Sequence, residues 1–238
     1  MAMEQEGMNT KDARNNIFLI DSKGLVSLER QNEKDPHKVM YAKPLPLSAN
    51  LAEIVDMVKP SCLVGVCAQP GVFTETVLNK MAQHNANPII FPLSNPTSKA
   101  ECTAEQAYTY TDGHAIFASG SPFDIFKYKD QTFIPGQGNN SYIFPGVALA
   151  VMSCSVPTIP EEVFLVAAKA LADQVTSNDL AEGRVYPPLK KIQEVSVKIA
   201  AKVSQYLFVQ GLASVRPEPD DKELFIRQHQ YNYSYDNE

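Results

Sequence analysis

Short apolar runs alternate along the first half of the chain with segments whose apolar residues repeat at helical spacing. The runs cover residues 17–20, 62–66, 88–91 and 115–118, and each is continuous rather than alternating. A continuous run is typical of a strand that is covered on both faces, as in a parallel sheet. We therefore predict four buried strands at these positions.

Three helices are expected around these strands. One covers residues 51–58, with Ser48 as its cap, and a second covers residues 74–81, with its first residue as N-cap. A third begins at Thr103, where Gln106 completes a capping-box pattern. The alternation of strands and helices predicts an α/β fold, a doubly wound parallel sheet of the Rossmann type.

The second half of the chain has a different pattern. A loop rich in Gly, Pro and Asn is expected over residues 119–141, and three helices follow at about 145–152, 160–175 and 189–208. The end of the chain is polar, and residues 230–238 are expected to be unstructured.

These patterns predict two parts of unequal size. Residues 1–208 are expected to form the Rossmann-type domain with its C-terminal helices. Residues 209–238 are expected to form a C-terminal extension.

Composition excludes several classes of partner. The 238 residues are 44% hydrophobic and carry a formal net charge of −6, with no Lys/Arg cluster, which makes the chain a poor ligand for nucleic acid or anionic lipid. The longest apolar stretch, residues 143–152, is too short to span a bilayer, and residues 1–16 lack the apolar core of a signal peptide. We expect an intracellular protein, cytoplasmic or mitochondrial, that binds neither nucleic acid nor membrane.

The cysteines and histidines indicate no metal site. Cys62, Cys67, Cys102 and Cys154 form no C-x-x-C pair, and the four histidines lie far apart in the sequence. Cys62, Cys67 and Cys154 stand in apolar runs, so we expect reduced thiols packed in the core.

In a doubly wound sheet, ligands bind at the carboxyl ends of the strands, so the residues after each run are the candidate site. Asp21 follows the first run. An acid there accepts hydrogen bonds from an adenosine ribose, but Asp is equally typical of a turn. Small residues follow the second run, where a dinucleotide could approach the backbone, although a plain strand-to-helix turn has the same composition. These residues are Gly65, Val66, Cys67 and Ala68.

Asparagines mark two further candidate positions. Asn95 follows the third run, and its uncharged amide suits a carboxylate or a carboxamide. Asn before Pro is also a common turn, and the turn is favoured when the residue is taken singly. Asn139 and Asn140 stand in a glycine-bearing loop ahead of a helix, which suits either close approach to a ligand or simple flexibility.

The chain contains no G-x-G-x-x-G fingerprint, although a complete Rossmann domain begins with a strand that carries it. Residues 3–7, ahead of the first apolar run, are typical of the end of a crossover helix. We therefore expect a sheet truncated at its first strand, without the phosphate-binding turn.

Four long motifs carry a resemblance to a known family. They are SNPTSKAECTAEQAY at 94–108, FASGSPF at 117–123, PGQGNNSYIFPGVAL at 135–149 and EGRVYPPL at 182–189. In this order, and with a match that runs from about residue 3 to about residue 235, the chain closely resembles the malic enzymes.

The resemblance implies a decarboxylating malate dehydrogenase, which oxidises malate with NAD or NADP and releases pyruvate and CO₂ with the help of Mn²⁺ or Mg²⁺. It implies that malate is bound by Asn95, Asn139 and Asn140. It also implies that the cofactor is contacted by Asp21, Ser22, Ser94 and the turn Gly65, Val66, Cys67 and Ala68. Family members assemble as homo-oligomers, so a dimer or tetramer is expected.

The chain departs from this family in extent. It lacks the family's N-terminal half, which carries the catalytic Tyr and Lys, a malate-binding Arg and the metal-ligating carboxylates. We therefore expect no catalytic residue and no metal ligand in this chain, and no activity from the chain alone. Two hypotheses stay open: a fragment of a complete malic enzyme, or a short non-catalytic relative that binds nucleotide or associates with full-length subunits.

The choice between NAD and NADP depends on charge near the adenosine ribose. Asp21 alone suits NAD, because a carboxylate repels a 2′-phosphate. The sequence Ser22-Lys23-Gly24, however, resembles the NADP-using malic enzymes, and Lys38 lies near where those enzymes place a lysine for the 2′-phosphate. The alternative is that Lys38 is an ordinary surface lysine. We expect NADP to be preferred.

Overall fold

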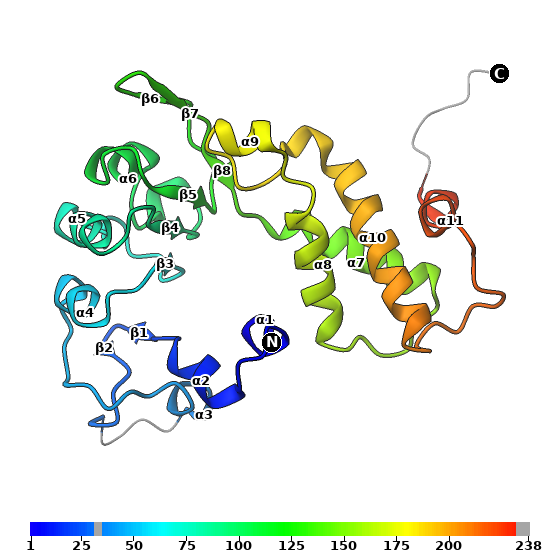
Figure 1. Ribbon diagram of the computed structural model, residues 1–238, viewed down its shortest axis with the longest axis horizontal. Helices are drawn as coiled ribbons and strands as arrows, with labels where there is room; N and C mark the ends of the chain where they lie inside the picture. Colours follow the sequence, from blue (N-terminus) through cyan, green and yellow to red (C-terminus); the bar gives the residue numbers. More distant parts are fainter. Residues whose placement is uncertain (31–34, 232–238) are drawn as a thin grey trace. The chain divides into compact units, whose positions relative to one another are not determined.

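The computed structural model describes residues 1–30 and 35–231. It consists of two compact units, Met1–Gly138 and Asn139–Glu238, which are described separately below (Figure 1).

The first unit is built on a four-stranded parallel sheet. Its strands are β3 (Cys62–Gly65), β4 (Ile89–Pro92), β5 (Ile116–Ser119) and β8 (Gly136–Gln137), in that spatial order. Helix α5 (Glu75–His84) connects β3 to β4, and α6 (Ala104–Tyr110) connects β4 to β5. The predicted α/β fold of the Rossmann type is confirmed, and three of the four predicted strands belong to this sheet.

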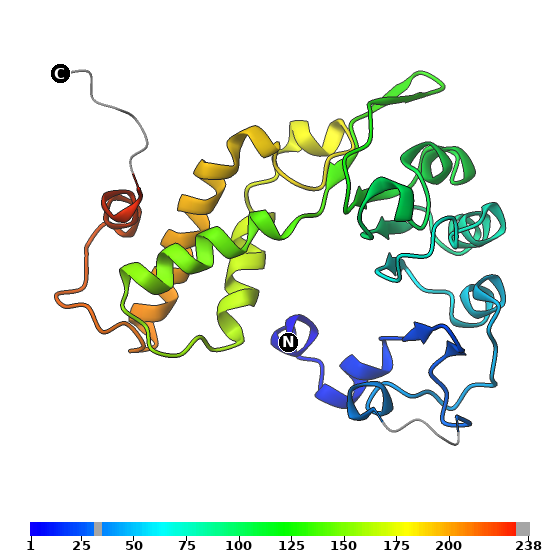
Figure 2. The same cartoon turned by 180° about the vertical axis from the view of Figure 1, so that it is seen from behind.

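One face of this sheet is buried by helices. Leu63, Ile90 and Phe117 lie side by side on β3, β4 and β5, because the strands pair in that register. They pack against α4 (Leu51–Val58), α5 and α6, which line up along the sheet in both views (Figures 1 and 2). Burying an apolar side chain of this size contributes roughly 1.5–3 kcal/mol. This layer fixes the positions of the strand ends.

Two of the cysteines are not in the core, so that expectation is wrong for Cys62 and Cys67, whereas Cys154 is buried as expected. Successive strand residues point to opposite faces. Leu63 points to the helices, so Cys62 and Val64 point to the other face, where Val64 is 51% exposed. Cys67 lies beyond the end of β3, in an exposed turn.

Side-chain caps fix where the helices of the first unit begin. The predicted N-cap of α5, Thr74, accepts a hydrogen bond from the backbone N–H of Val77, and the predicted capping box of Thr103 with Gln106 is present on α6. Ser48 does not cap α4, contrary to our prediction. The cap is Asn50, whose side chain reaches the N–H of Ala52, because it directly precedes the first helical residue.

The apolar run at residues 17–20 does not join the parallel sheet, so the prediction of a buried strand there is wrong. Its last residue belongs to β1 (Ile20–Asp21), which pairs antiparallel with β2 (Gly24–Leu25). The chain reverses at Ser22 and Lys23, and Gly24 begins β2 with φ +90°. An added Cβ at Gly24 would lie 2.0 Å from the carbonyl oxygen of Ser48. Ile20 is consequently 40% exposed. Short helices flank this ribbon: α1 (Ala2–Gln5), α2 (Thr10–Asn15) and α3 (Pro36–Val39).

The segment 119–141 is more ordered than the expected loop. It contains β8 and an antiparallel hairpin of β6 (Phe126–Tyr128) and β7 (Gln131–Phe133). The ring of buried Phe133 stacks on Tyr108 of α6, with centroids 4.0 Å apart, and so holds the hairpin against the first unit. The sequence did not reveal these strands, because each has only two or three residues and they stand among Gly and Pro residues.

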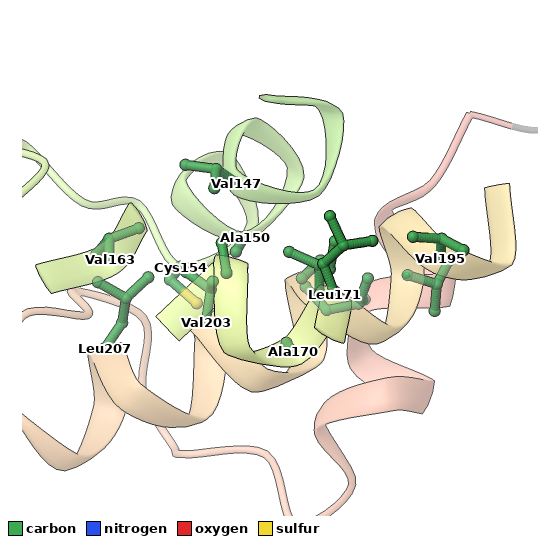
Figure 3. Close-up of a cluster of buried hydrophobic side chains, with 14 of the residues drawn as sticks. Val147, Ala150, Cys154, Val163, Ala170, Leu171, Val195, Val203 and Leu207 are labelled. Atoms are coloured by element: carbon green, nitrogen blue, oxygen red, sulfur yellow. The ribbon is translucent and has the colours of Figure 1, made fainter. Parts of the chain in front are cut away.

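The second unit is helical. The three predicted helices are confirmed as α7 (Phe144–Ser153), α8 (Glu162–Ala172) and α10 (Ile192–Val209). Figure 3 shows their buried side chains meeting in one cluster, with Val147 and Ala150 of α7 facing the side of α10 that carries Val203. The remaining elements are α9 (Ser177–Ala181), α11 (Lys222–His229) and the 3₁₀ turns η1 (Thr97–Lys99, in the first unit), η2 (Asn140–Tyr142) and η3 (Leu189–Lys191).

The C-terminal extension is partly ordered. Helix α11 buries Phe225 and Ile226 in the cluster of the second unit, and Arg227 pairs with Glu194 of α10 at 2.7 Å. Most of the segment 230–238, for which we expect no structure, lies outside the described residues. No helix among the described residues is long and apolar enough to cross a membrane.

The contact between α7 and α10 generates a test. An added Cβ at Gly146 would lie 2.8 Å from Cγ2 of Ile199 and 2.9 Å from the carbonyl oxygen of Ser196. We expect Gly146→Ala to lower the free energy of unfolding by about 1–3 kcal/mol, because the packed helices must separate. Urea unfolding followed by circular dichroism measures this.

The matched control is Ala148→Ser, on the exposed side of the same helix. It is expected to change stability by less than about 0.5 kcal/mol. A Gly146→Ala variant as stable as the wild type would mean that the two helices do not approach this closely.

Candidate functional site

A buried carboxylate joins the carboxyl ends of β3 and β4. Glu101, which is 0% exposed, lies between η1 and α6. Its Oε1 accepts hydrogen bonds from the backbone N–H of Cys67 at 3.0 Å and from the hydroxyl of Ser94. Its Oε2 accepts from the backbone N–H of Ser94 at 3.4 Å. The two predicted cofactor segments, the β3 turn and Ser94, are therefore tied to one side chain.

Sequence reasoning missed Glu101, although it lies inside one of the motifs that resemble a family. The available signal was an acidic residue between Ala100 and Cys102, immediately before the helix cap. Burial opposes ionisation of this carboxyl, but its hydrogen bonds from Ser94 and from backbone N–H groups outweigh that cost and lower its pKa. Glu101 is therefore a carboxylate at neutral pH.

The β3 turn directs its N–H groups inward. The N–H of Ala68 donates to the Ser94 hydroxyl at 2.9 Å, next to the bond from Cys67 to Glu101. Ser94 itself is buried, so its hydroxyl and its N–H are both engaged within the protein. Val66, Cys67 and Ala68 are exposed, and Val66 is 75% exposed, so the outward surface of the turn is apolar.

Gly65 leaves the room that Glu101 occupies. A Cβ at Gly65 would lie 2.5 Å from the carboxyl carbon of Glu101 and 2.7 Å from its Oε2. We predicted that small residues here either let a dinucleotide approach the protein backbone or simply form a strand-to-helix turn. In the structure the close neighbour is the buried side chain of Glu101.

Asn95 is exposed at the end of β4, close to the end of β5. Its Oδ1 accepts a hydrogen bond from the hydroxyl of Ser121 at 2.6 Å. Gly120 permits this approach, because a Cβ there would lie 2.2 Å from the carbonyl oxygen of Leu93 and 2.9 Å from Nδ2 of Asn95. This arrangement fixes the amide and directs its carbonyl group to Ser121, a residue that sequence reasoning missed.

Asp21 and Lys38, predicted separately, lie together in the first unit. The Asp21 carboxylate accepts both Nη atoms of Arg30, at 2.8 and 2.9 Å, and Nζ of Lys38 at 2.7 Å. The backbone N–H of Lys23 completes the group, while Ser22 is exposed beside it. Hydrogen bonds from Arg30, and then from Lys38, hold the pKa of Asp21 well below its ordinary range. Two cationic side chains thus pair with the one Asp21 carboxylate.

Asn139 and Asn140 belong to the second unit. The side chain of Asn139 accepts the backbone N–H of Ser141 at 2.9 Å and caps η2, and Asn140 is the first residue of that turn. Both are exposed. Asn139 therefore stabilises the start of η2, whether or not it also binds a ligand.

A metal centre is not part of this site as described. Among residues 1–30 and 35–231, no group of three or more His, Cys, Asp and Glu side chains is placed to hold one ion. The polar groups present are the amide of Asn95, the β3 turn hydrogen-bonded to the Ser94 hydroxyl, and the cations that pair with Asp21. This set fits a nucleotide.

Comparison with known families decides the relationship. Residues 1–208 match the family model of the malic enzyme NAD-binding domain. The chain belongs to the malic enzyme family. The parallel sheet flanked by helices in its first unit is the Rossmann-like architecture expected of such a domain.

Named malic enzymes match almost the whole chain. The human mitochondrial NADP-dependent malic enzyme is 48% identical over 237 residues, which are 99% of this chain and 39% of that protein. The mouse NADP-dependent malic enzyme is 50% identical over 99% of this chain and 41% of its own length. The mitochondrial NAD-dependent malic enzyme of Ascaris suum is 45% identical over 98% of this chain and 36% of its own length. The chain thus spans about two fifths of the length of these malic enzymes.

Solved structures give the same fold. The malic enzyme of Entamoeba histolytica aligns with a TM-score of 0.68 at 20% identity, over 90% of this chain and 41% of that one. The malic enzyme of Pyrococcus horikoshii aligns with a TM-score of 0.53 at 24% identity, over 71% of this chain and 34% of that one. At these identities the likeness concerns the fold alone.

The Asp21 cluster predicts a pH dependence of stability. Pairing lowers the pKa of the folded carboxyl below its ordinary value of 3.8, so the stabilisation is present above that value and is lost as the pH falls through the folded pKa. We expect Asp21→Asn to cost about 1–3 kcal/mol at pH 7, because nearly buried Arg30 loses its partner. The difference from wild type should shrink once the pH falls below 3.8.

Urea unfolding at pH 7 and at pH 3 measures this. Asp124→Asn, at an exposed position of the first unit, is the control and should change stability by less than about 0.5 kcal/mol at either pH. An Asp21→Asn cost that is the same at both pH values would show that the ion pair is not the source of the stabilisation.

Proposed function

We propose that this chain is the dinucleotide-binding part of a malic enzyme that oxidises and decarboxylates malate to pyruvate and CO₂ in the complete protein. The observation that carries the proposal is the family match over residues 1–208. The grouping of Asn95 with Ser121 and of the β3 turn with Ser94, at the carboxyl ends of neighbouring strands, supports it.

This chain's own residues bind and orient the reactants in that proposal. The amide of Asn95 donates from Nδ2 to a malate carboxylate while Ser121 holds its Oδ1, and Asn139 and Asn140 serve the same substrate. The β3 turn, Ser94 and the Asp21 cluster would hold the dinucleotide, which would supply the hydride acceptor for malate oxidation. A Mn²⁺ or Mg²⁺ ion would need ligands that this chain is not proposed to supply. The isolated chain is therefore proposed to bind dinucleotide without turning over malate.

A short relative that binds nucleotide without catalysis is the alternative. Both candidates require dinucleotide binding by this chain. The main proposal includes assembly as a homo-dimer or homo-tetramer, which rests on family membership. It also includes a location in the cytoplasm or in mitochondria, which is supported by the mitochondrial relatives.

We further propose that NADP is preferred to NAD. Asp21 would repel a 2′-phosphate if it were unpaired. Arg30 and Lys38 both pair with its carboxylate, which offsets that repulsion. The Lys38 side chain is 36% exposed, and in this proposal its ammonium group forms a charge-assisted hydrogen bond with the phosphate.

Replacing Lys38 tests the cofactor and the choice between NADP and NAD. We expect the wild-type chain to bind NADPH more tightly than NADH, and Lys38→Gln to weaken NADPH binding by about tenfold or more, the size of a lost hydrogen bond to a charged group, with little effect on NADH. Titration of the dinucleotide fluorescence measures both dissociation constants.

Lys127→Gln makes the same change of charge on the exposed strand β6 and should leave both constants unaltered. A wild-type chain that binds neither dinucleotide would defeat the proposed function. A preference for NADH, or a Lys38→Gln variant that keeps the preference for NADPH, would defeat the NADP assignment alone.

Asn95 is tested in the complete enzyme. We expect Asn95→Ala to weaken malate use by roughly 1.5–3 kcal/mol, the size of a lost hydrogen bond to a charged group, with an unchanged melting temperature. Asn139→Ala should lower both malate use and stability, the latter by about 1 kcal/mol, because Asn139 also caps η2. Steady-state kinetics and thermal melts give the two readouts. Normal malate kinetics in a destabilised Asn95→Ala enzyme would show that Asn95 is only a turn residue.

A further inference from the structure

Glu101 is a charged group buried beneath the exposed turn that follows β3, and the malate chemistry proposed above does not use it. We propose that Glu101 is a positioning residue that holds the β3 turn and Ser94 in the shape on which the dinucleotide lies. The inference rests on the proposed function, since it names the group that shapes the same site.

The hydrogen bonds converge on this one carboxylate from two strands. Cys67 and Ser94, at the ends of β3 and β4, both donate to it. Ala68 reaches it through the Ser94 hydroxyl, which accepts from the Ala68 N–H and donates to Oε1 of Glu101. Two consecutive N–H groups of the turn are thereby drawn inward by a single buried anion.

Burying a charged group costs free energy, so a buried carboxylate stays ionised only where hydrogen-bond donors stabilise its charged form. Glu101 is 0% exposed and its hydrogen bonds to N–H and O–H donors lower its pKa, in agreement with an ionised group. Gly65 provides the space, because any Cβ there would come within 2.5 Å of the Glu101 side chain. Ala68 adopts a positive φ of 54° in the same turn. The turn is thus built around the carboxylate.

The outward surface of the turn follows from this arrangement. The N–H groups of Cys67 and Ala68 are engaged inside, the exposed side chains of the turn lie outward, and a buried carboxylate lies beneath them. Such a surface suits an uncharged part of a dinucleotide, a ribose or a ring, and is unfavourable for its phosphates. Without the carboxylate, the Cys67 N–H would lose its acceptor. The Ser94 hydroxyl, which accepts from Ala68, would lose the group that orients it, and the turn would lose this shape.

Glu101→Gln in the full 238-residue chain is the test, because the amide retains the size of the side chain while removing its charge. We expect faster amide hydrogen exchange in the peptide that contains Cys67 and Ala68. We also expect NADPH binding, followed by fluorescence titration, to weaken by about tenfold, with the helical circular dichroism signal retained. Ser94→Ala breaks the link from Ala68 to Glu101 and should cause a smaller loss of NADPH affinity. This variant replaces Glu101→Gln as the test if Glu101→Gln does not fold.

Thr111→Val is the matched control. Like Ser94→Ala, this substitution removes a buried hydroxyl, here one that donates to the Ala107 carbonyl and accepts from the Ala115 N–H. Thr111, however, lies before β5, at the amino edge of the sheet. It should lower the melting temperature without changing exchange at the β3 turn or the dissociation constant of NADPH. A purely structural role for Glu101 predicts the same pattern for Glu101→Gln.

The outcomes separate the two proposals. Unchanged exchange and an NADPH dissociation constant within about twofold of wild type, in a folded Glu101→Gln variant, would overturn the positioning role. If the wild-type chain binds neither NADPH nor NADH, the proposed function fails. In that case exchange at the turn still decides whether Glu101 shapes it.

Discussion

Parallel pairing of β3, β4 and β5 is the constraint on which the rest of the first unit depends. Because Leu63, Ile90 and Phe117 stand in register and are covered by α4, α5 and α6, all three strands end at the same edge of the sheet. Residues that are far apart in the sequence are brought together there by the pairing of the strands. The pairs formed by Asn95 with Ser121 and by Ala68 with Ser94 are consequences of that edge.

Much of the fold could be predicted from local patterns. Continuous apolar runs located three strands of the sheet, and polar caps such as Thr74 and Thr103 located helix starts, because both signals depend on neighbouring residues alone. The run at residues 17–20 misled because its composition is that of a buried strand, whereas its pairing depends on the reversal at Ser22 and Lys23. Two-residue β8 has too few residues to produce any periodicity.

The candidate site was predictable to a smaller extent. Position after an apolar run selected Asp21 and Asn95 as candidates, because ligands bind at the carboxyl ends of parallel strands. Asn95 does follow a strand of the parallel sheet, whereas Asp21 lies in the antiparallel ribbon. Arg30 and Ser121, with which these two residues pair, were missed, since a sequence does not reveal which polar side chains turn inward. Glu101, which accepts from Cys67 and Ser94, was missed for the same reason. Ser94 was selected as a contact of the cofactor, yet its hydroxyl is engaged within the protein. Cation pairing at Asp21 likewise offsets the negative charge that this residue alone would present.

The tight fit between Gly65 and Glu101 bears on how this region varies between relatives. A side chain at position 65 would collide with the glutamate, and a shorter residue at position 101 would leave the turn without its acceptor. Neither residue can be substituted without loss of this fit while the other stays unchanged. The two sites should therefore evolve as a pair, with substitutions at one accompanied by compensating substitutions at the other or in the turn between β3 and α5.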